Sequence, residues 1–211
     1  CLDVTSSIVD EAVEKGCNLI VSHHPLIFRP LKRVVGADDV QRAVAKAIKH
    51  DITILSMHTN MDNAQGGVNF KMAEKMQLTG VKFFTEKQVD GITCGSGVMG
   101  ELPGAMAADD FIMMLKREFD VECVQCNQLL RRPIRMVAIC GGAGSFLLPE
   151  AIAAGADAFV TGEMHYHDYF AHEQEIQIAV IGHYQSEQYT YEIFKSIIEE
   201  QCEGVRCVVT S

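Results

Sequence analysis

The sequence lacks any apolar run approaching the ~18 residues that a membrane-spanning helix needs, and it is poor in basic residues. Its 18 Lys and Arg are outnumbered by 28 Asp and Glu, which gives a formal net charge of -10. A general nucleic-acid or anionic-membrane binder usually carries the opposite balance. We therefore expect no membrane span and no nucleic-acid partner. The 211 residues, 48% of them apolar, suffice to bury a core in one domain or two small ones.

The sequence also lacks the cysteine spacing of a disulfide framework or a zinc ribbon. Its eight cysteines are scattered, and Cys17, Cys94 and Cys140 lie in apolar, strand-like runs. Such residues are typical of small buried side chains in a reducing compartment, so we expect a cytoplasmic protein. Cys123 and Cys126 form a lone CxxC without a second pair, and this is weak support for a redox or zinc motif.

Strand-like and helix-like segments alternate from end to end. The segment 37–50 has apolar residues at 40, 43, 44, 47 and 48, which is the spacing of a helix. Further helices are expected at 6–15, 66–76, 107–119, 146–155 and 186–200, and strands at 18–22, 51–57, 92–102, 121–126, 135–140, 157–162, 176–182 and 205–210. This alternation predicts an α/β fold with mostly parallel sheets.

The pattern pauses near 77–91, and it repeats roughly on either side of the pause. EKGCNLIVSHH (14–24) and AAGADAFVTGEMHYH (153–167) each end a strand in a loop that contains histidine. We therefore predict two similar three-layer α/β lobes, 1–88 and 89–211. The opening CLDVTSS is typical of a strand end that enters a helix cap, so we expect a start upstream of Cys1 and a first lobe without its N-terminal segment.

Four strand-end loops contain six of the eight histidines. The loops are Ser22-His23-His24-Pro25, His58-Thr59-Asn60-Met61-Asp62, Glu163-Met164-His165-Tyr166-His167-Asp168 and His183-Tyr184-Gln185-Ser186-Glu187. Because open parallel sheets bind ligands at the carboxyl ends of their strands, we expect these loops to share one site. Imidazole with carboxylate suits a divalent ion such as zinc, manganese, iron or nickel.

The spacing within these loops suggests how metal would be held. Adjacent His23 and His24 on an extended segment would point in different directions and could bind two ions. His183 and Glu187 are four residues apart, so both would face one cluster if a helix begins near His183. Asp62 could bridge two ions. This set of ligands is small for two ions, so coordination positions would remain open for water, as in catalytic metal sites.

Several residues keep a second interpretation. The loop 141–145, GGAGS, follows a strand and precedes a helix, so it could cradle a phosphate. It lacks the lysine of a P-loop, so a tight turn is the alternative. Glu163 could instead cap the helix that follows it. His58 could simply bond a backbone carbonyl, and only one of His165 and His167 can face a shared point.

Together, SHHPLIF (22–28), HTNMD (58–62), GEMHYHD (162–168) and GHYQSE (182–187) resemble, in order, the motifs of the Nif-three-like family. This family is also called the YbgI-type dinuclear metal-centre family, and many members are named as homologues of type-two GTP cyclohydrolase. The resemblance spans essentially the whole chain. It departs at Met61, where leucine is more usual, and in lacking the domain that longer members insert between the lobes.

The resemblance implies two divalent metal ions in a cleft between the lobes and a ring-shaped hexamer. The metal ligands that it implies are His23, His24, Asp62, His183 and Glu187. His58 matches a position that lines the site, and Glu163 and His165 belong to a stretch that faces the same cleft. These last three are the candidate catalytic residues, as proton carriers.

We therefore predict a metal-dependent hydrolase that acts on a small molecule, with a nucleotide as one candidate. Opening of the guanine ring of GTP rests on the resemblance alone, and a phosphoesterase suits the same ligands. The alternative from another class is a non-catalytic metal-binding scaffold that forms a ring. A ring that encircles DNA is disfavoured by the net charge of -10.

Overall fold

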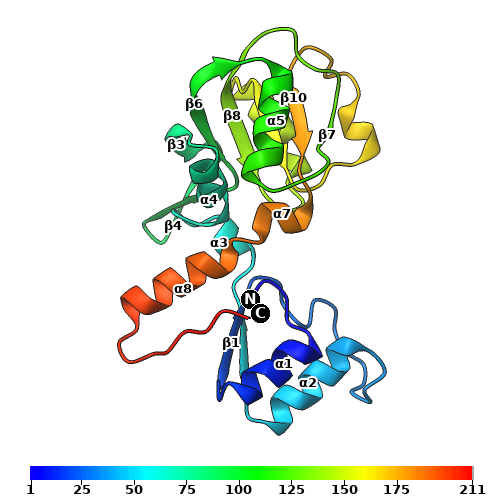
Figure 1. The fold of residues 1–211 in the computed structure, drawn as a ribbon, viewed down its shortest axis with the longest axis vertical. Helices are drawn as coiled ribbons and strands as arrows, with labels where there is room; N and C mark the ends of the chain where they lie inside the picture. Colours follow the sequence, from blue (N-terminus) through cyan, green and yellow to red (C-terminus); the bar gives the residue numbers. More distant parts are fainter. Residues whose placement is uncertain (211) are drawn as a thin grey trace. The chain divides into compact units, whose positions relative to one another are not determined.

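The computed structural model describes residues 1–210, whose helices and strands alternate along the chain (Figure 1). The predicted α/β class is confirmed. The chain divides into two compact units, Cys1–Met61 with the segment from Thr190 onward, and Asp62–Tyr189. Each unit is described by itself below.

The first unit is built on two parallel strands, β1 (Leu19–Ser22) and β2 (Thr53–Ser56), paired with Ile20 opposite Ile54. Helix α1 (Ser6–Glu14) precedes β1, and helix α2 (Asp39–Lys49) connects β1 to β2. Helix α8 (Thr190–Gln201) belongs to the same unit. Val9 and Ala43, one from each of the two first helices, are fully buried in the core of this unit with Ile20.

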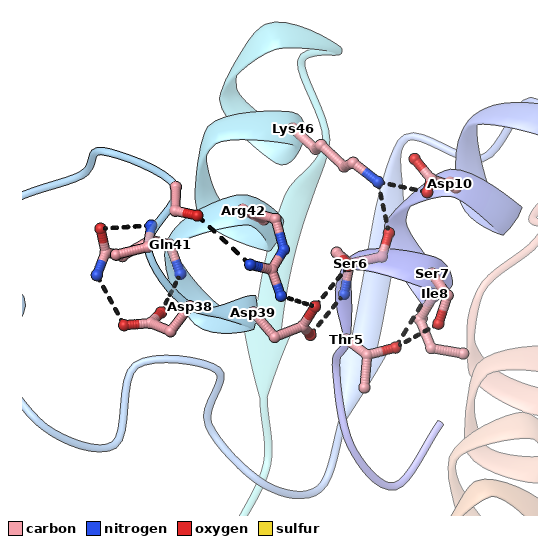
Figure 2. Close-up of polar contacts among 12 residues, drawn as sticks. Thr5, Ser6, Ser7, Ile8, Asp10, Asp38, Asp39, Gln41, Arg42 and Lys46 are labelled. Atoms are coloured by element: carbon pink, nitrogen blue, oxygen red, sulfur yellow. Dashed lines mark hydrogen bonds and ion pairs between the residues drawn. The ribbon is translucent and has the colours of Figure 1, made fainter.

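Polar contacts fasten α1 to α2 (Figure 2). The Asp39 carboxylate accepts hydrogen bonds from the backbone N–H of Ser6 at 2.9 Å and from its hydroxyl at 2.6 Å. Arg42 pairs with the same carboxylate at 3.2 Å. One turn further, Lys46 donates to Asp10 and to the carbonyl of Ser6. Asp39 lies in the first turn of α2, and its carboxylate also meets the first residue of α1, Ser6. The dipoles of both helices favour a negative charge there, so these contacts fix how the pair lies.

The second unit contains a six-stranded sheet in the order β3-β6-β8-β9-β10-β7. Its three central strands are parallel, and the pairs at both sides are antiparallel. The strands are β3 (Thr79–Phe83), β6 (Val98–Met106), β7 (Gln125–Cys126), β8 (Ile134–Cys140), β9 (Ala158–Thr161) and β10 (Gln177–Val180). A separate hairpin is formed by β4 (Glu86–Val89) and β5 (Ile92–Gly95).

Helices cover both faces of this sheet. Val137 and Ile139 of β8 pack in one core with α4 (Val68–Lys75) and α5 (Ala108–Glu118), whereas Ala138 and Cys140 pack in another with α6 (Leu148–Ala153). The remaining elements are α3 (Thr59–Asp62), α7 (His183–Glu187) and the short 3₁₀ helices η1 (Ser145–Leu147) and η2 (Tyr166–Tyr169). The central strands are therefore buried on both faces, as parallel strands are elsewhere.

The predicted organisation differs from the structure in several respects. The domain boundary at 88/89 falls inside the second unit, because β3 pairs with β6 across it, Lys82 opposite Met99. The units are not alike, since the first pairs two strands and the second six, and the larger sheet is mixed rather than mostly parallel. The helix expected at 186–200 is two helices, α7 and α8, and 205–210 is not a strand.

The expected absence of a membrane span can be checked for residues 1–210. Within that range, no helix combines the length and the apolar character that crossing a bilayer would require.

Asp157 joins the starts of β8 and β9. Its carboxylate accepts hydrogen bonds from the backbone N–H groups of Arg135 at 2.9 Å and Met136 at 2.8 Å, and it pairs with Arg132. Burial by itself would raise the pKa of Asp157, but the two backbone donors and the guanidinium outweigh it and lower the pKa. The ionised carboxylate therefore stabilises the folded state.

Asp157→Asn should lower the free energy of unfolding by about 1–2 kcal/mol at pH 7, because a charge-assisted acceptor is lost. The folded-state pKa lies below the unfolded value of ~3.9. This stabilisation is therefore present above pH ~4 and is lost as the pH falls through the folded pKa. Urea unfolding at pH 7 and pH 3, with Asp90→Asn at an exposed turn as control, measures it. A gap that stays constant with pH would contradict the account.

Candidate metal centre

Three histidines of the first unit gather at the ends of its two strands. His23 and His24 follow β1, and His58 follows β2. One ring nitrogen of each lies within 4.8 Å of the others. Because parallel strands end at the same edge, the sequence predicted this convergence. His23 is fully buried, and the other two are partly exposed.

The backbone bends at His23 and His24 instead of staying extended. Both backbone N–H groups donate to the carbonyl of Leu2, at 3.1 and 3.0 Å. The two rings are therefore 4.9 Å apart at their centroids rather than on opposite sides of a strand. The two side chains thus lie close together, and one ring nitrogen of each belongs to the group that also contains His58.

Hydrogen bonds fix how these rings are presented. Nδ1 of His23 lies 3.1 Å from the carbonyl of Met57, and Nδ1 of His24 lies 2.9 Å from the carboxylate of Asp3. Carbonyls and carboxylates only accept, so each Nδ1 carries the proton and the lone pair of the neutral ring is on Nε2. Metal-binding histidines characteristically have such an oxygen behind the ring. Asp3 was not predicted from the sequence, because it is 21 positions from His24 and belongs to no motif.

The second unit gathers a histidine and two carboxylates. Helix α7 begins at His183 rather than at 186, which is the condition under which His183 and Glu187 were expected to face one cluster. It places His183 Nε2 3.1 Å from Glu187 Oε2. A carboxylate oxygen of Asp62, at the end of α3, lies within 4.8 Å of one from Glu187. Glu187 is buried, with 3% of its surface exposed. This group combines one nitrogen donor with two oxygen donors.

Glu163 lies behind His183. Its Oε1 is 2.7 Å from His183 Nδ1, while the residue that caps η2 is His165. The hydrogen bond and charge of Glu187, helped by Glu163, raise the pKa of His183 to about 9 although burial lowers it. At neutral pH and without metal, this imidazole is therefore charged, and a metal ion would replace its Nε2 proton.

The glycine-rich loop 141–145 is a tight turn whose backbone is hydrogen-bonded to side chains near this group. The backbone N–H of Gly141 donates to Asn69 at 2.8 Å, that of Gly142 to Ser186 at 2.9 Å and that of Gly144 to Thr161 at 3.2 Å. A phosphate cradle needs these N–H groups for its ligand. The structure therefore supports the tight-turn interpretation.

Two residues of this support escaped sequence analysis. Asn69, 1% exposed in α4, also donates from Nδ2 to the carbonyl of Asp62 at 3.0 Å, so one amide holds Asp62 and Gly141 together. Ser186 donates to the carbonyl of His183 at 2.7 Å. A buried polar side chain inside a helix has no local signature that distinguishes it from a surface residue.

Cys140 lies at the end of β8 near the two carboxylates. Burial, followed by the charges of Asp62 and Glu187, raises the pKa of the Cys140 thiol to about 12. The thiol is therefore neutral, and only a thiolate would be a nucleophile or metal ligand. The donors of this region are nitrogen and oxygen.

The remaining candidates lie beside these groups. His58 contacts the ring of Phe28, which is 72% exposed, with centroids 6.4 Å apart. The side chain of His165 is 88% exposed, with Nδ1 3.5 Å from Asp168. His165 and Glu163 both line a cavity of about 690 Å³ in the second unit.

Comparison with known proteins gives matches along the whole chain. The family described as Duf34/NIF3 (NGG1p interacting factor 3) matches residues 1–211. A Streptococcus pneumoniae serotype 4 protein named GTP cyclohydrolase 1 type 2 homolog is 34% identical over 170 residues, covering 79% of this chain and 63% of that protein. A Clostridium perfringens protein of the same name is 33% identical over 189 residues, covering 88% and 71%. The chain thus spans less than two thirds of the first relative.

Solved structures agree on the fold. The Staphylococcus aureus protein SA1388 superposes with a TM-score of 0.85 at 27% identity, covering 100% of this chain and 84% of that one. A Bacillus cereus protein related to NIF3 superposes with a TM-score of 0.82 at 23% identity, covering 99% and 88%. The second, at its lower identity, supports the fold alone.

Gly162, at the end of β9, allows the close approach on which His183 depends. A Cβ at this position would lie 2.7 Å from the carbonyl oxygen of Gly142, 2.7 Å from Ser186 Oγ and 2.9 Å from the Cα of His183. Since two of these atoms are backbone, α7 would have to move.

Gly162→Ala should lower zinc or manganese affinity about tenfold, the effect of disturbing an orienting contact. It should also cost about 1–3 kcal/mol of stability through overpacking. Calorimetric titration and urea unfolding measure the two effects. Gly104→Ala is the control, because a Cβ there meets no atom within 4 Å. A destabilised variant with unchanged affinity would show that the position of His183 does not matter for metal.

Proposed function

Because the chain belongs to the Duf34/NIF3 family, we propose that it binds two divalent metal ions through five residues. These ligands are His23, His24, Asp62, His183 and Glu187. They are the set that the resemblance of the sequence motifs implies.

The observation that carries this proposal is a shared hydrogen-bond arrangement. In His23, His24 and His183, Nδ1 faces an oxygen acceptor at 3.1, 2.9 and 2.7 Å. Each ring can therefore offer Nε2 to a metal in a fixed orientation. Structural histidines in a core have no need for the same arrangement three times at strand ends. The carboxylates of Asp62 and Glu187 add oxygen donors, so the set fits a divalent ion.

The donor chemistry narrows the choice of metal. Imidazole with carboxylate suits zinc, manganese, iron or nickel. Among the described residues, the groups that could hold an ion contain histidine and carboxylate and no cysteine, whereas a structural zinc site would commonly use cysteine.

We further propose a metal-dependent hydrolase acting on a small molecule. Bound divalent metal would supply Lewis acidity and a lowered pKa of water. Glu163 orients His183 and holds a proton at its Nδ1. His58 and His165, both accessible to solvent, are the proposed proton carriers.

The substrate proposal rests on the names of the relatives. These point to GTP and to a cyclohydrolase-like reaction, and hydrolysis of a phosphoester suits the same ligands. The alternative is a metal-binding scaffold without catalysis. A hexameric assembly and a cytoplasmic location remain predictions from the sequence.

Elemental analysis of protein purified without chelator or metal-affinity resin should find about two ions per chain, as the dinuclear proposal requires. Asp62→Ala and Glu187→Gln should each lower this content while circular dichroism stays unchanged, because neither residue packs in a hydrophobic core. His50→Ala and Glu175→Gln are matched controls at exposed positions. Full metal content in both ligand variants would reject the ligand assignment.

His165→Ala should leave metal content unchanged and lower kcat about 100-fold, the scale of a lost proton carrier. The assay would screen GTP and p-nitrophenyl phosphoesters with metal-loaded protein, and His167→Ala, two residues along the same loop, is the control. A protein that holds both ions and hydrolyses none of these compounds would favour the scaffold. Equal rates for the two variants would remove His165 from the catalytic residues.

A further inference from the structure

The cavity of about 690 Å³ lies entirely within the second unit. Its walls come from three segments: 120–125 leading into β7, 162–165 after β9, and 180–185 where β10 meets α7. This volume falls in the range of small-molecule sites. It opens at the carboxyl ends of two parallel strands, where ligands of such sheets bind.

The charged groups of the cavity are of one sign. Asp120, Glu122 and Glu163 line it, and its lining includes neither Lys nor Arg. His165 is the one basic side chain among them. Walls of one charge sign concentrate ions of the opposite charge. The cavity therefore favours a cation and disfavours phosphate or carboxylate.

The rest of the lining suits a ligand that has an apolar body and N–H groups. Val121, Met164, Val180 and Ile181 supply apolar surface. Two amide side chains, Gln125 and Gln185, add hydrogen-bond acceptors and donors.

Gly182 leaves the space that the amide of Gln185 occupies. Gly182 has φ +102°, and a Cβ there would lie 2.2 Å from Gln185 Oε1. Any larger residue at 182 would displace the amide. Since Gly182 directly precedes His183, the cavity wall and the metal-binding residue share one turn.

Glu163 connects the cavity to the proposed metal ligands. It lines the cavity and also accepts the hydrogen bond of His183 Nδ1 at 2.7 Å. A ligand that contacts Glu163 in the cavity would therefore be separated from His183, a proposed metal ligand, by one side chain.

We propose that this cavity binds an organic cation: an ammonium or amidinium group on an apolar body, recognised by Glu122 and Asp120. This proposal rests on the proposed function. It names the chemical class of the part of the substrate that does not react. It follows that a polyphosphate tail does not enter this cavity, and a nucleotide substrate would place its phosphates elsewhere.

Three probes of one shape and different charge test the proposal: benzamidine, benzamide and benzoate. Benzamidine should bind, benzamide should bind about tenfold more weakly, and benzoate should not bind. Glu122→Gln should weaken benzamidine about tenfold through loss of a charge-assisted hydrogen bond. Glu86→Gln, exposed on β4 and outside the cavity, should leave it unchanged. Calorimetry and ligand-observed NMR measure these affinities.

Alkylation locates the bound probe. Cys123 is exposed and lines the cavity, whereas Cys202 is exposed in the other unit. Benzamidine should slow the reaction of Cys123 with iodoacetamide and leave Cys202 unchanged, as measured by peptide mass spectrometry.

Equal affinity for benzoate and benzamidine, or alkylation of Cys123 at the same rate with and without benzamidine, would overturn the proposal. The same samples are analysed for metal. Normal metal content without protection of Cys123 rejects the cavity proposal alone. Protection of Cys123 in a chain that takes up no metal supports the cavity and rejects the proposed metal function.

Discussion

The arrangement on which the site depends is a hydrogen bond from histidine Nδ1 to an oxygen. It occurs at His23, His24 and His183, with a carbonyl or a carboxylate as acceptor. Each bond fixes a ring that could otherwise rotate and so sets the direction in which its Nε2 points. The surrounding structure serves these bonds: strand ends supply the histidines, and the bend at 23–24 brings two rings together.

In the second unit, the close approach of backbone segments also fixes the position of a candidate ligand, His183. The loop 141–145 is held by side chains of Asn69, Ser186 and Thr161, and Gly162 leaves room for the start of α7. The loop that resembles a phosphate cradle is therefore a tight turn that approaches α7 closely, since a Cβ at Gly142 would lie 2.3 Å from Glu187 Oε1. Burial next to two carboxylates keeps Cys140 neutral, so this region offers nitrogen and oxygen without sulfur.

Much of this was predictable from the sequence because it follows from local periodicity. The helices at 39–49, 68–75 and 108–118 follow apolar spacing, and Asp38 caps the first of them. The start of α7 at His183 did not follow in this way, because the predicted helix began at 186. The antiparallel pairings of β3, β6 and β7 could not be predicted in this way, because strand order depends on partners distant in the chain. The unit boundary was misplaced for the same reason: the pause at 77–91 contains β3 and β4, which pair within the second unit. Asp3 and Asn69 act through bonds that span 21 and 72 residues, and no motif reports such distances.

The negative charge of the chain and its proposed metal ligands belong to one account, because carboxylates orient histidines, offer oxygen donors and line the cavity. The most direct test of that account is X-ray absorption at the metal edge of protein loaded with zinc or manganese. We predict a first shell of nitrogen and oxygen only, with the outer-shell scattering of imidazole rings. Sulfur at ~2.3 Å, or a shell without imidazole, would contradict the assignment of the histidines as ligands.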